Sequence, residues 1–179
     1  MKLIILDRDG VINVDSDEFV KSADEWLPIP GSVEAIARLS RAGWTVAIAT
    51  NQSGLARGLF NVASLEAMHE KMRSLIKQAG GQISMIVYCP HGPEDGCECR
   101  KPLPGLFQQI ADYFHVSLAD VPTVGDSLRD LQAGASLGCK PFLVRTGKGR
   151  RTEAQTLPPG TQVFDSLADV AEHLLESQA

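Results

Sequence analysis

The sequence has few aromatic residues, no excess of positive charge and no long apolar run. Phe, Trp and Tyr make up 6% of its 179 residues, and the formal net charge is −5. Surfaces that bind nucleic acid need a basic excess, often with aromatic side chains for base stacking, so we expect no nucleic-acid partner. No apolar segment approaches the roughly 20 residues that cross a bilayer, so we expect no membrane partner. The first strand begins at the N-terminus without room for a signal peptide, which predicts a cytoplasmic protein.

Cysteine is also scarce, and the positions of the four cysteines argue against a disulfide framework. Cys89, Cys97 and Cys99 fall within eleven residues, whereas Cys139 stands alone in an apolar stretch. Such a cluster is typical of a metal site in a reducing compartment. We expect Cys139 to be a small buried hydrophobic residue. Three histidines lie away from the cluster and are expected to be packed or solvated: His69, His115 and His173.

Apolar strands alternate with amphipathic helices along the chain. The predicted strands cover 2–6, 45–49, 83–88, a short run that ends at 124, 141–144 and 162–164. The predicted helices cover 32–41, 64–79, 105–114, 127–137 and 166–176. This alternation predicts a single α/β domain over residues 1–179, Rossmann-like, with a mainly parallel sheet between two layers of helices. Ser32 is the predicted N-cap of the first helix, and the segment 147–160 is predicted to be a mobile surface loop.

Two carboxylates follow the first strand, one residue apart. The run 3–6 is wholly aliphatic, which indicates a strand covered on both faces, and Asp7 and Asp9 come directly after it. Ligands of parallel sheets collect at the carboxyl ends of the strands. Because side chains alternate along a strand, we expect both carboxylates to point to one side, where a cation would offset their repulsion. A polar turn that only caps the strand is the alternative.

Polar residues also follow three other predicted strands. Thr50 ends the second, Lys101 comes after the third, and Asp126 and Asp130 follow the fourth. The order of the motifs resembles the haloacid dehalogenase superfamily of phosphotransferases across nearly the whole chain. The motifs that carry the resemblance are Asp7-Arg8-Asp9-Gly10, Thr50, Lys101 and Gly125-Asp126-x-x-x-Asp130. Asp130 is either a carboxylate that stabilises a helix N-terminus or a partner of the site.

The resemblance implies a reaction through an aspartyl phosphate. Asp7 is expected to attack phosphorus, and Asp9 to protonate the leaving oxygen and then to activate water. Magnesium is expected to be held by the Asp7 carboxylate, the Asp9 backbone carbonyl and Asp126, which are hard oxygen ligands. Lys101 and the Thr50 hydroxyl are expected to bind phosphate oxygens. For Asp9 to serve as an acid, its acidic neighbours should raise its pKa.

The segment 89–99 contains three thiols and an imidazole, on Cys89, His91, Cys97 and Cys99. These four ligands complete a tetrahedral zinc site and leave no position for water, which predicts a structural role. Proline and glycine between them allow the tight turns of a short loop. Because residues 100 and 101 follow the last ligand directly, zinc would fix the position of the phosphate-binding lysine. A coincidental cluster is the alternative.

Within the superfamily, the zinc loop followed by Cys-Arg-Lys-Pro resembles phosphatases of heptose bisphosphates and phosphatases of histidinol phosphate. The segment 51–58 looks like the heptose group, so a small sugar bisphosphate is the expected partner and histidinol phosphate the alternative. Arg57 and Arg100 would bind the far phosphate, because a guanidinium fork binds phosphate bidentately. The expected substrate-binding set is Asp15, Ser16, Asp17, Glu18, Asn51, Gln52, Ser53, Arg57 and Arg100.

Cap domains are common in this superfamily, and none is expected here. The intervals between the first three motifs are filled by ordinary helices and strands and by the zinc loop. Specificity would then come from the loops 15–18, 51–58 and 90–101, and a monomer is expected. An interpretation of a different class is a zinc-knuckle module that binds nucleic acid or protein, against which the acidic charge counts.

Overall fold

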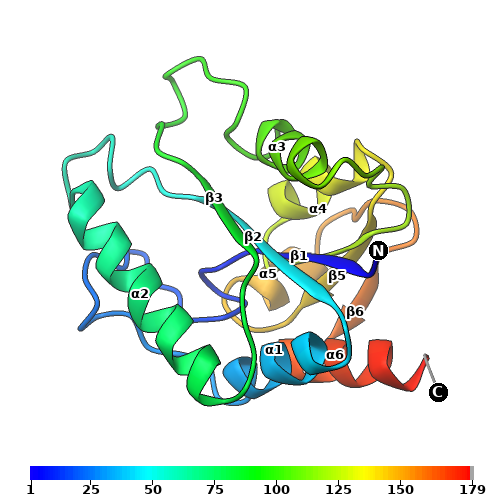
Figure 1. Ribbon diagram of the computed structural model, residues 1–179. Helices are drawn as coiled ribbons and strands as arrows, with labels where there is room; N and C mark the ends of the chain where they lie inside the picture. The colour runs from blue at the N-terminus through cyan, green and yellow to red at the C-terminus, as the bar shows by residue number, and fades with distance from the viewer. Residues whose placement is uncertain (178–179) are drawn as a thin grey trace.

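A six-stranded parallel sheet forms the centre of the computed structural model, which describes residues 1–177 (Figure 1). The strands are β1 (Leu3–Leu6), β2 (Thr45–Asn51), β3 (Met85–Cys89), β4 (Pro122–Gly125), β5 (Lys140–Val144) and β6 (Gln162–Phe164). Their order in the sheet is β3-β2-β1-β4-β5-β6, and every neighbouring pair is parallel. The predicted α/β architecture with a parallel sheet is confirmed. The last two residues of the predicted domain lie outside the described part of the chain.

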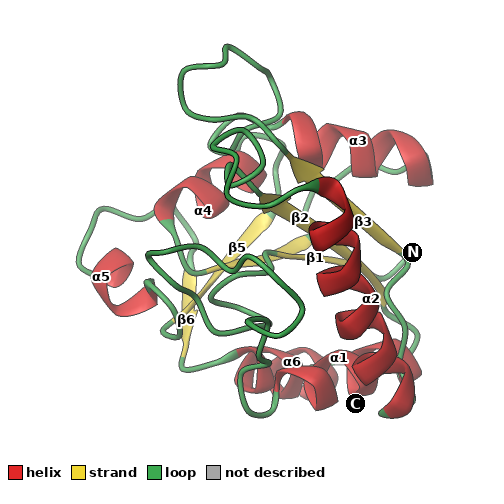
Figure 2. Cartoon of the chain, turned by 90° about the vertical axis from the view of Figure 1, so that its left-hand side faces the viewer, coloured by secondary structure: helices red, strands yellow, loops and turns green. Residues whose placement is uncertain are grey.

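Helices cover both faces of the sheet (Figures 1 and 2). They are α1 (Ser32–Arg41), α2 (Val62–Gln78), α3 (Gly105–Phe114), α4 (Leu128–Ala135), α5 (Gly149–Glu153) and α6 (Leu167–Glu176). One buried apolar cluster joins α1, α2 and α6 to the sheet, and the other joins α3 to its opposite face. Met68 and Met72 of α2 are fully buried in the first cluster.

The central strand explains where the polar residues gather. In β1, Ile4 and Leu6 belong to one apolar cluster and Leu3 and Ile5 to the other, so the strand is covered on both faces. β2 lies on one side of β1 and β4 on the other, because the chain reverses its direction of crossover there. Ligands of open parallel sheets bind beyond the carboxyl ends of the strands at such a switch point. The ends of β1, β2 and β4 therefore meet where a site is expected.

Two local predictions are corrected. The N-cap of α1 is Gly31, in the left-handed region at φ 87°, because the Ser32 hydroxyl instead donates a buried hydrogen bond to the Ile12 carbonyl oxygen at 2.6 Å. The segment 147–160 is not simply a surface loop. It contains the short helix α5, and Thr152 in that helix is buried and donates to the Asp126 carbonyl oxygen at 2.7 Å.

The described chain leaves no room for a cap. Between Asp9 and Thr50 it holds a loop, α1 and β2, and between Thr50 and Lys101 it holds α2, β3 and the Cys/His loop. That last loop projects beyond the end of β3, at the top of Figure 1. Among residues 1–177, no helix is both long enough and apolar enough to cross a bilayer.

Candidate active site

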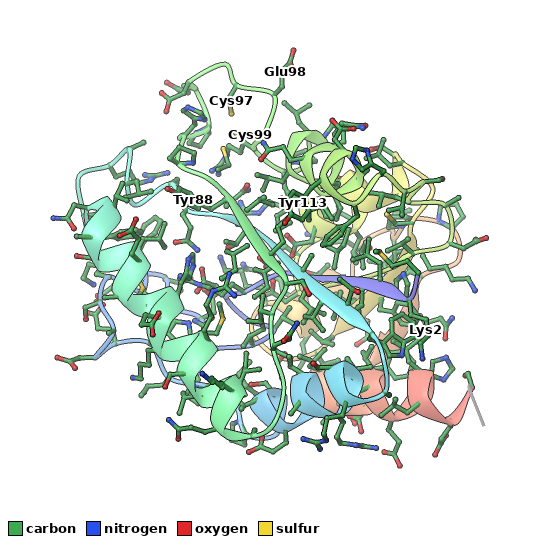
Figure 3. All side chains as sticks on the ribbon, viewed as in Figure 1. Lys2, Tyr88, Cys97, Glu98, Cys99 and Tyr113 are labelled. Carbon is green, nitrogen blue, oxygen red and sulfur yellow. The ribbon has the colours of Figure 1, made fainter. Side chains whose placement is uncertain are left out.

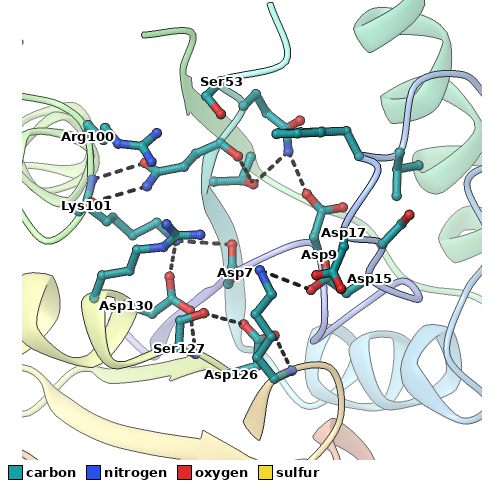
Figure 4. Close-up of a pocket in the computed structure, with 18 of the residues that line it drawn as sticks. Asp7, Asp9, Asp15, Asp17, Ser53, Arg100, Lys101, Asp126, Ser127 and Asp130 are labelled. Atoms are coloured by element: carbon teal, nitrogen blue, oxygen red, sulfur yellow. Dashed lines mark hydrogen bonds and ion pairs between the residues drawn. The ribbon is translucent and has the colours of Figure 1, made fainter. Parts of the chain in front are cut away.

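A cavity of about 210 Å³ opens at the carboxyl ends of β1, β2 and β4 (Figure 4). It collects residues from segments far apart in the sequence. The predicted site residues that line it are Asp7, Asp9, Asp15, Ser16, Asp17, Thr50, Asn51, Gln52, Ser53, Arg57, Arg100, Lys101 and Asp126. Glu18 is an exception, because its side chain is exposed and is not among the lining residues. The loop 15–18 thus presents three of its four predicted residues to the cavity.

Lys101 is the buried cation at the floor of this site, and its side chain is 1% exposed. Its Nζ donates to Asp7 Oδ1 at 3.1 Å, to Asp130 Oδ1 at 2.8 Å and to the Ala49 carbonyl oxygen at 2.7 Å. Burial lowers the pKa of a lysine, but Asp130 and Asp7 together hold the pKa of Lys101 above its usual value. A charged amine in contact with Asp7 can bind the oxygens of a phosphoryl group there.

Asp130, whose role the sequence left open, has both carboxylate oxygens engaged. Oδ1 accepts from Lys101, and Oδ2 accepts from the backbone N–H of Ser127 at 3.1 Å. The carboxylate therefore joins the N-terminus of α4 to the buried lysine. Although burial acts to raise it, the charge of Lys101 holds the pKa of Asp130 below the usual value. Asp130 is thus placed to orient Lys101.

Asp7 and Asp126 form an acidic pair whose chemistry fits a hard cation. Burial and the nearby Asp130 raise the pKa of Asp7 well above its usual value and that of Asp126 to about 7. One oxygen of each, with one of Asp130, lies within 4.8 Å of the others. Clustered buried carboxylates that resist ionisation are a donor set that Mg²⁺ suits, because the cation compensates their charge.

The backbone approaches Asp126 closely enough to fix its carboxylate. Gly10, at φ 85°, lies against it, and a Cβ at that position would collide with the carboxylate. Lys148 donates its backbone N–H to Asp126 Oδ2 at 2.9 Å, and the Ser127 hydroxyl donates to Oδ1 at 3.3 Å. A glycine is required at position 10 because it combines a left-handed φ with the absence of a side chain.

The expectation of a raised pKa for Asp9 is wrong for this structure. Its Oδ1 accepts from Arg8 Nη2 at 2.8 Å and from Asn13 Nδ2 at 2.8 Å, and its Oδ2 accepts from Gln52 Nε2 at 2.9 Å. Burial acts to raise the pKa of Asp9, but the Arg8 charge and these hydrogen bonds outweigh it and hold the pKa below its usual value. Nearby cationic and amide donors, rather than acidic neighbours, dominate the surroundings of this carboxylate.

The turn after β2 connects the Asp9 side of the cavity to the lysine side. Thr50 is buried, and its hydroxyl oxygen accepts from Gln52 Nε2 at 3.0 Å. Asn51 bonds to the backbone of Lys101 twice, accepting from its N–H at 3.0 Å and donating to its carbonyl oxygen at 3.3 Å. Asn51 therefore holds the lysine segment against β2, in addition to lining the cavity.

The four predicted zinc ligands lie together: Cys89 is the last residue of β3, and the other three are on the loop between β3 and α3, where Figure 3 labels Cys97 and Cys99. Cys89 Sγ lies 3.5 Å from His91 Nδ1, 3.6 Å from Cys97 Sγ and 2.9 Å from Cys99 Sγ. Zn–S bonds of about 2.3 Å place the sulfurs of a tetrahedral site about 3.8 Å apart, close to most of these separations. Three thiols and one ring nitrogen thus fit a closed zinc site.

Several lining residues were missed at the level of sequence. Arg129 and Lys148 line the cavity, and Lys148 Nζ lies 3.7 Å from Asp15 Oδ2. Arg129 lies inside the fourth motif, and Lys148 lies between two glycines. Their basic side chains at these positions were the signal in the sequence that could have identified them. Phe19 was also missed, and the Arg57 guanidinium lies 5.4 Å from the centre of its ring. No periodicity or motif marked that contact.

Comparison with known proteins agrees with this arrangement. A HAD-hydrolase-like family model matches residues 98–170, and a polynucleotide kinase 3 phosphatase model matches residues 2–128. A parallel sheet with Asp7, Thr50 and Asp126 at the ends of β1, β2 and β4, and with Lys101 in contact with Asp7, defines together with these matches a hydrolase of the haloacid dehalogenase type.

Closer relatives narrow the class. Proteins named D-glycero-beta-D-manno-heptose-1,7-bisphosphate 7-phosphatase match from Bordetella bronchiseptica (64% identity, 98% of this chain and 99% of the relative) and Pseudomonas aeruginosa (59%, 97% and 98%). The crystal structure of D,D-heptose 1,7-bisphosphate phosphatase from B. bronchiseptica, complexed with magnesium and phosphate, superposes with a TM-score of 0.98 at 63% identity over 99% of both chains. This chain belongs to the D-glycero-beta-D-manno-heptose-1,7-bisphosphate 7-phosphatase family, and it is a phosphoric monoester hydrolase.

Proposed function

We propose that the chain removes the 7-phosphate of D-glycero-D-manno-heptose 1,7-bisphosphate in the biosynthesis of ADP-heptose, a precursor of the lipopolysaccharide core. The observation that carries this proposal is the contact of Asp7 with the buried Lys101 at the floor of a polar cavity, in a chain at 64% identity to a phosphatase of that name. The relatives do not favour the histidinol-phosphate alternative, and a catalytic cavity argues against a zinc-knuckle module.

The first half of the reaction transfers the phosphoryl group to Asp7. An Asp7 oxygen forms a bond to phosphorus while the bond from phosphorus to the sugar oxygen breaks, and Asp9 gives its proton to that oxygen. Lys101 and the Thr50 hydroxyl would bind the oxygens that gain charge. The pKa of Asp9 is low without substrate, so we expect the arriving phosphate dianion to raise it by like-charge repulsion.

The second half restores the enzyme. Asp9, now ionised, takes a proton from water, the water oxygen attacks phosphorus, and the bond to Asp7 breaks to release inorganic phosphate. The Asp7 carboxylate, the Asp9 backbone carbonyl and Asp126 would hold Mg²⁺. When bound, this ion neutralises the negative charge that otherwise repels a phosphate ester from Asp7.

The three loops around the cavity would bind the rest of the substrate. Asp15, Ser16 and Asp17 offer acceptors for sugar hydroxyls, and Arg57 and Arg100 offer guanidinium groups for the 1-phosphate. Glu18, on the same loop, points to solvent outside the cavity and is left out of this proposal. Zinc on the Cys/His loop would hold Arg100 in place, and Arg100 Nη1 already donates to the His91 carbonyl oxygen of that loop at 3.3 Å. We further propose a cytoplasmic monomer with one domain.

Two measurements test the proposal. Phosphate release with Mg²⁺ should be fastest from heptose 1,7-bisphosphate and much slower from histidinol phosphate. Asp7→Asn should fold normally and lose nearly all turnover, because an amide is not a nucleophile. Substantial turnover by purified Asp7→Asn would refute the aspartyl phosphate. A preference of the wild type for histidinol phosphate would refute the substrate and leave the chemistry intact.

A further inference from the structure

Arg8 stands between the two motif aspartates in sequence and is completely buried. A guanidinium carries five N–H donors and no acceptor, and a buried donor without a partner is costly. Two of its nitrogens, Nη2 and Nε, donate to the same oxygen of Asp9, Oδ1, at 2.8 Å and 3.2 Å. The third nitrogen, Nη1, points away from Asp9 and needs an acceptor elsewhere.

That acceptor is His69, which belongs to α2 and has no assigned role in the reaction. Arg8 Nη1 lies 3.2 Å from His69 Nε2. Because arginine can only donate, Nε2 must accept, which requires a neutral ring with its proton on Nδ1. Burial and the Arg8 charge lower the pKa of His69 to about 4, so the ring is neutral near pH 7. The sulfur of Met68, at 3.8 Å from the same nitrogen, is a weaker acceptor.

The hydrogen bonds at Asp9 differ between its two oxygens. Oδ1 accepts from Arg8 twice and from Asn13 Nδ2, so its lone pairs are fully used. Oδ2 accepts from Gln52 Nε2, a residue that itself lines the cavity. A proton can therefore reside on Oδ2 without displacing a charged donor, whereas Oδ1 has no free site for one.

We infer that His69 is a positioning residue for the phosphatase reaction: it fixes the Arg8 guanidinium, which in turn holds Asp9 with Oδ2 as the oxygen that carries the transferred proton. The inference rests on the proposed function, because Asp9 serves as the acid only there. His69 is about 60 positions away in sequence and reaches the site from the helix layer, so α2 contributes to the reaction without touching substrate.

Two substrates with different leaving groups distinguish a positioning role of His69 from a purely structural one. A sugar hydroxylate must receive a proton as it leaves, whereas p-nitrophenolate is a good leaving group without one. His69→Leu should lower kcat/KM for heptose 1,7-bisphosphate by at least about tenfold and leave kcat/KM for p-nitrophenyl phosphate within about twofold. His69→Gln should restore the sugar reaction, since its Oε1 can accept from Arg8. Met72→Leu, at a fully buried position one turn further along the same helix, is the control and should match the wild type on both substrates.

Equal losses on the two substrates would overturn the inference, because a damaged fold does not distinguish leaving groups. Unchanged kinetics in His69→Leu would overturn it as well. If that variant fails to fold, Arg8→Lys serves in its place. A lysine keeps the charge and cannot bridge both partners, so the same selective loss is expected, and its absence contradicts the inference. Asp9→Asn is measured in parallel. If this variant still hydrolyses the sugar ester, Asp9 is not the acid. If Asp9→Asn is inactive and His69→Leu behaves like the wild type, Asp9 remains the acid and only the positioning role of His69 is refuted.

Discussion

Lys101 is held between two carboxylates, and the chain offers an exposed ion pair for comparison. Both Lys101 and Asp130 are almost inaccessible to solvent, so Asp130→Asn leaves a buried charge with one partner fewer. We expect the free energy of unfolding to fall by about 3 kcal/mol, as for other broken buried pairs. Urea denaturation measures it.

The matched control for that variant is Asp165→Asn. Asp165 is 71% exposed and pairs with Arg145 at 2.7 Å on the surface, where such pairs contribute little. Its unfolding curve should coincide with that of the wild type. If Asp130→Asn is as stable as this control, the Lys101–Asp130 pair is not a structural element of the site.

Arg57 is exposed on the turn after β2 and faces the cavity beside Phe19. If Arg57 binds the second phosphate, Arg57→Ala should lower kcat/KM for the heptose bisphosphate by roughly tenfold. The kcat/KM for the heptose 7-monophosphate should not change, because this substrate has no second phosphate with which Arg57 could form a charged hydrogen bond. Added salt should reduce the difference. Arg38→Ala, an exposed arginine on α1, is the control. Equal effects on both substrates would show that Arg57 does not select the bisphosphate.

The pKa shifts at the ends of β1 and β4 predict how the effect of Mg²⁺ on stability depends on pH. Without a cation, burial and Asp130 raise the pKa of Asp7 and bring that of Asp126 to about 7, whereas both groups titrate near 4 when unfolded. Between about pH 4 and pH 7 the folded state therefore binds more protons, and these two carboxylates reduce stability as pH rises. Mg²⁺ relieves that penalty, because it binds the ionised forms.

We therefore expect Mg²⁺ to raise the thermal unfolding midpoint of chelator-treated protein strongly at about pH 7.5 and little at about pH 5. The difference with and without the metal cancels the contribution of other titrating groups, His69 among them. Asp126→Asn should lose most of the effect at the higher pH. A magnesium shift of the same size at both pH values would contradict the shifted pKa of Asp126.

The Cys/His loop gives a separate prediction about the second metal. Purified protein should contain about one zinc per chain, and chelating Mg²⁺ should abolish turnover without removing zinc. Cys97→Ser should lower the thermal midpoint and weaken kcat by loosening Lys101, which follows the loop directly. Cys139→Ser is the comparison, because that thiol is buried elsewhere and should affect stability alone. Protein without zinc, prepared free of chelator, would refute the site.

Elements with a local signature were predictable from the sequence. The helices at 32–41 and 105–114 and the strand at 162–164 have the predicted bounds, and the other predicted elements begin and end within two residues of those observed. Ser32 was misassigned because its hydroxyl has a tertiary partner, Ile12, which no local rule names. The low pKa of Asp9 was unpredictable for the same reason: it depends on the tertiary contacts of Asp9 with Arg8 and with Gln52, which lies in the turn after β2.

At the scale of the whole molecule, charge and the open site decide which phosphates can reach Asp7. A polynucleotide phosphatase model matches residues 2–128, so a 3′-phosphorylated oligonucleotide is the instructive substrate. The chain carries a formal charge of −5, and Asp15 and Asp17 add negative charge at the cavity itself. A polyanion is repelled by such a surface at long range, whereas a small sugar bisphosphate can enter and reach the arginines.

We therefore expect kcat/KM for a 3′-phosphorylated oligonucleotide to be at least about 100-fold below that for the heptose bisphosphate at low salt. Because screening weakens the repulsion, added salt should narrow the gap. Thymidine 3′-monophosphate is the control, because it has the same terminal ester without the polyanion. Its hydrolysis should show little salt dependence. The comparison therefore isolates the effect of the oligonucleotide's charge from that of the sugar. Efficient oligonucleotide hydrolysis that weakens with salt would instead indicate attraction, and would mean that the basic residues around the cavity outweigh the net charge of the molecule.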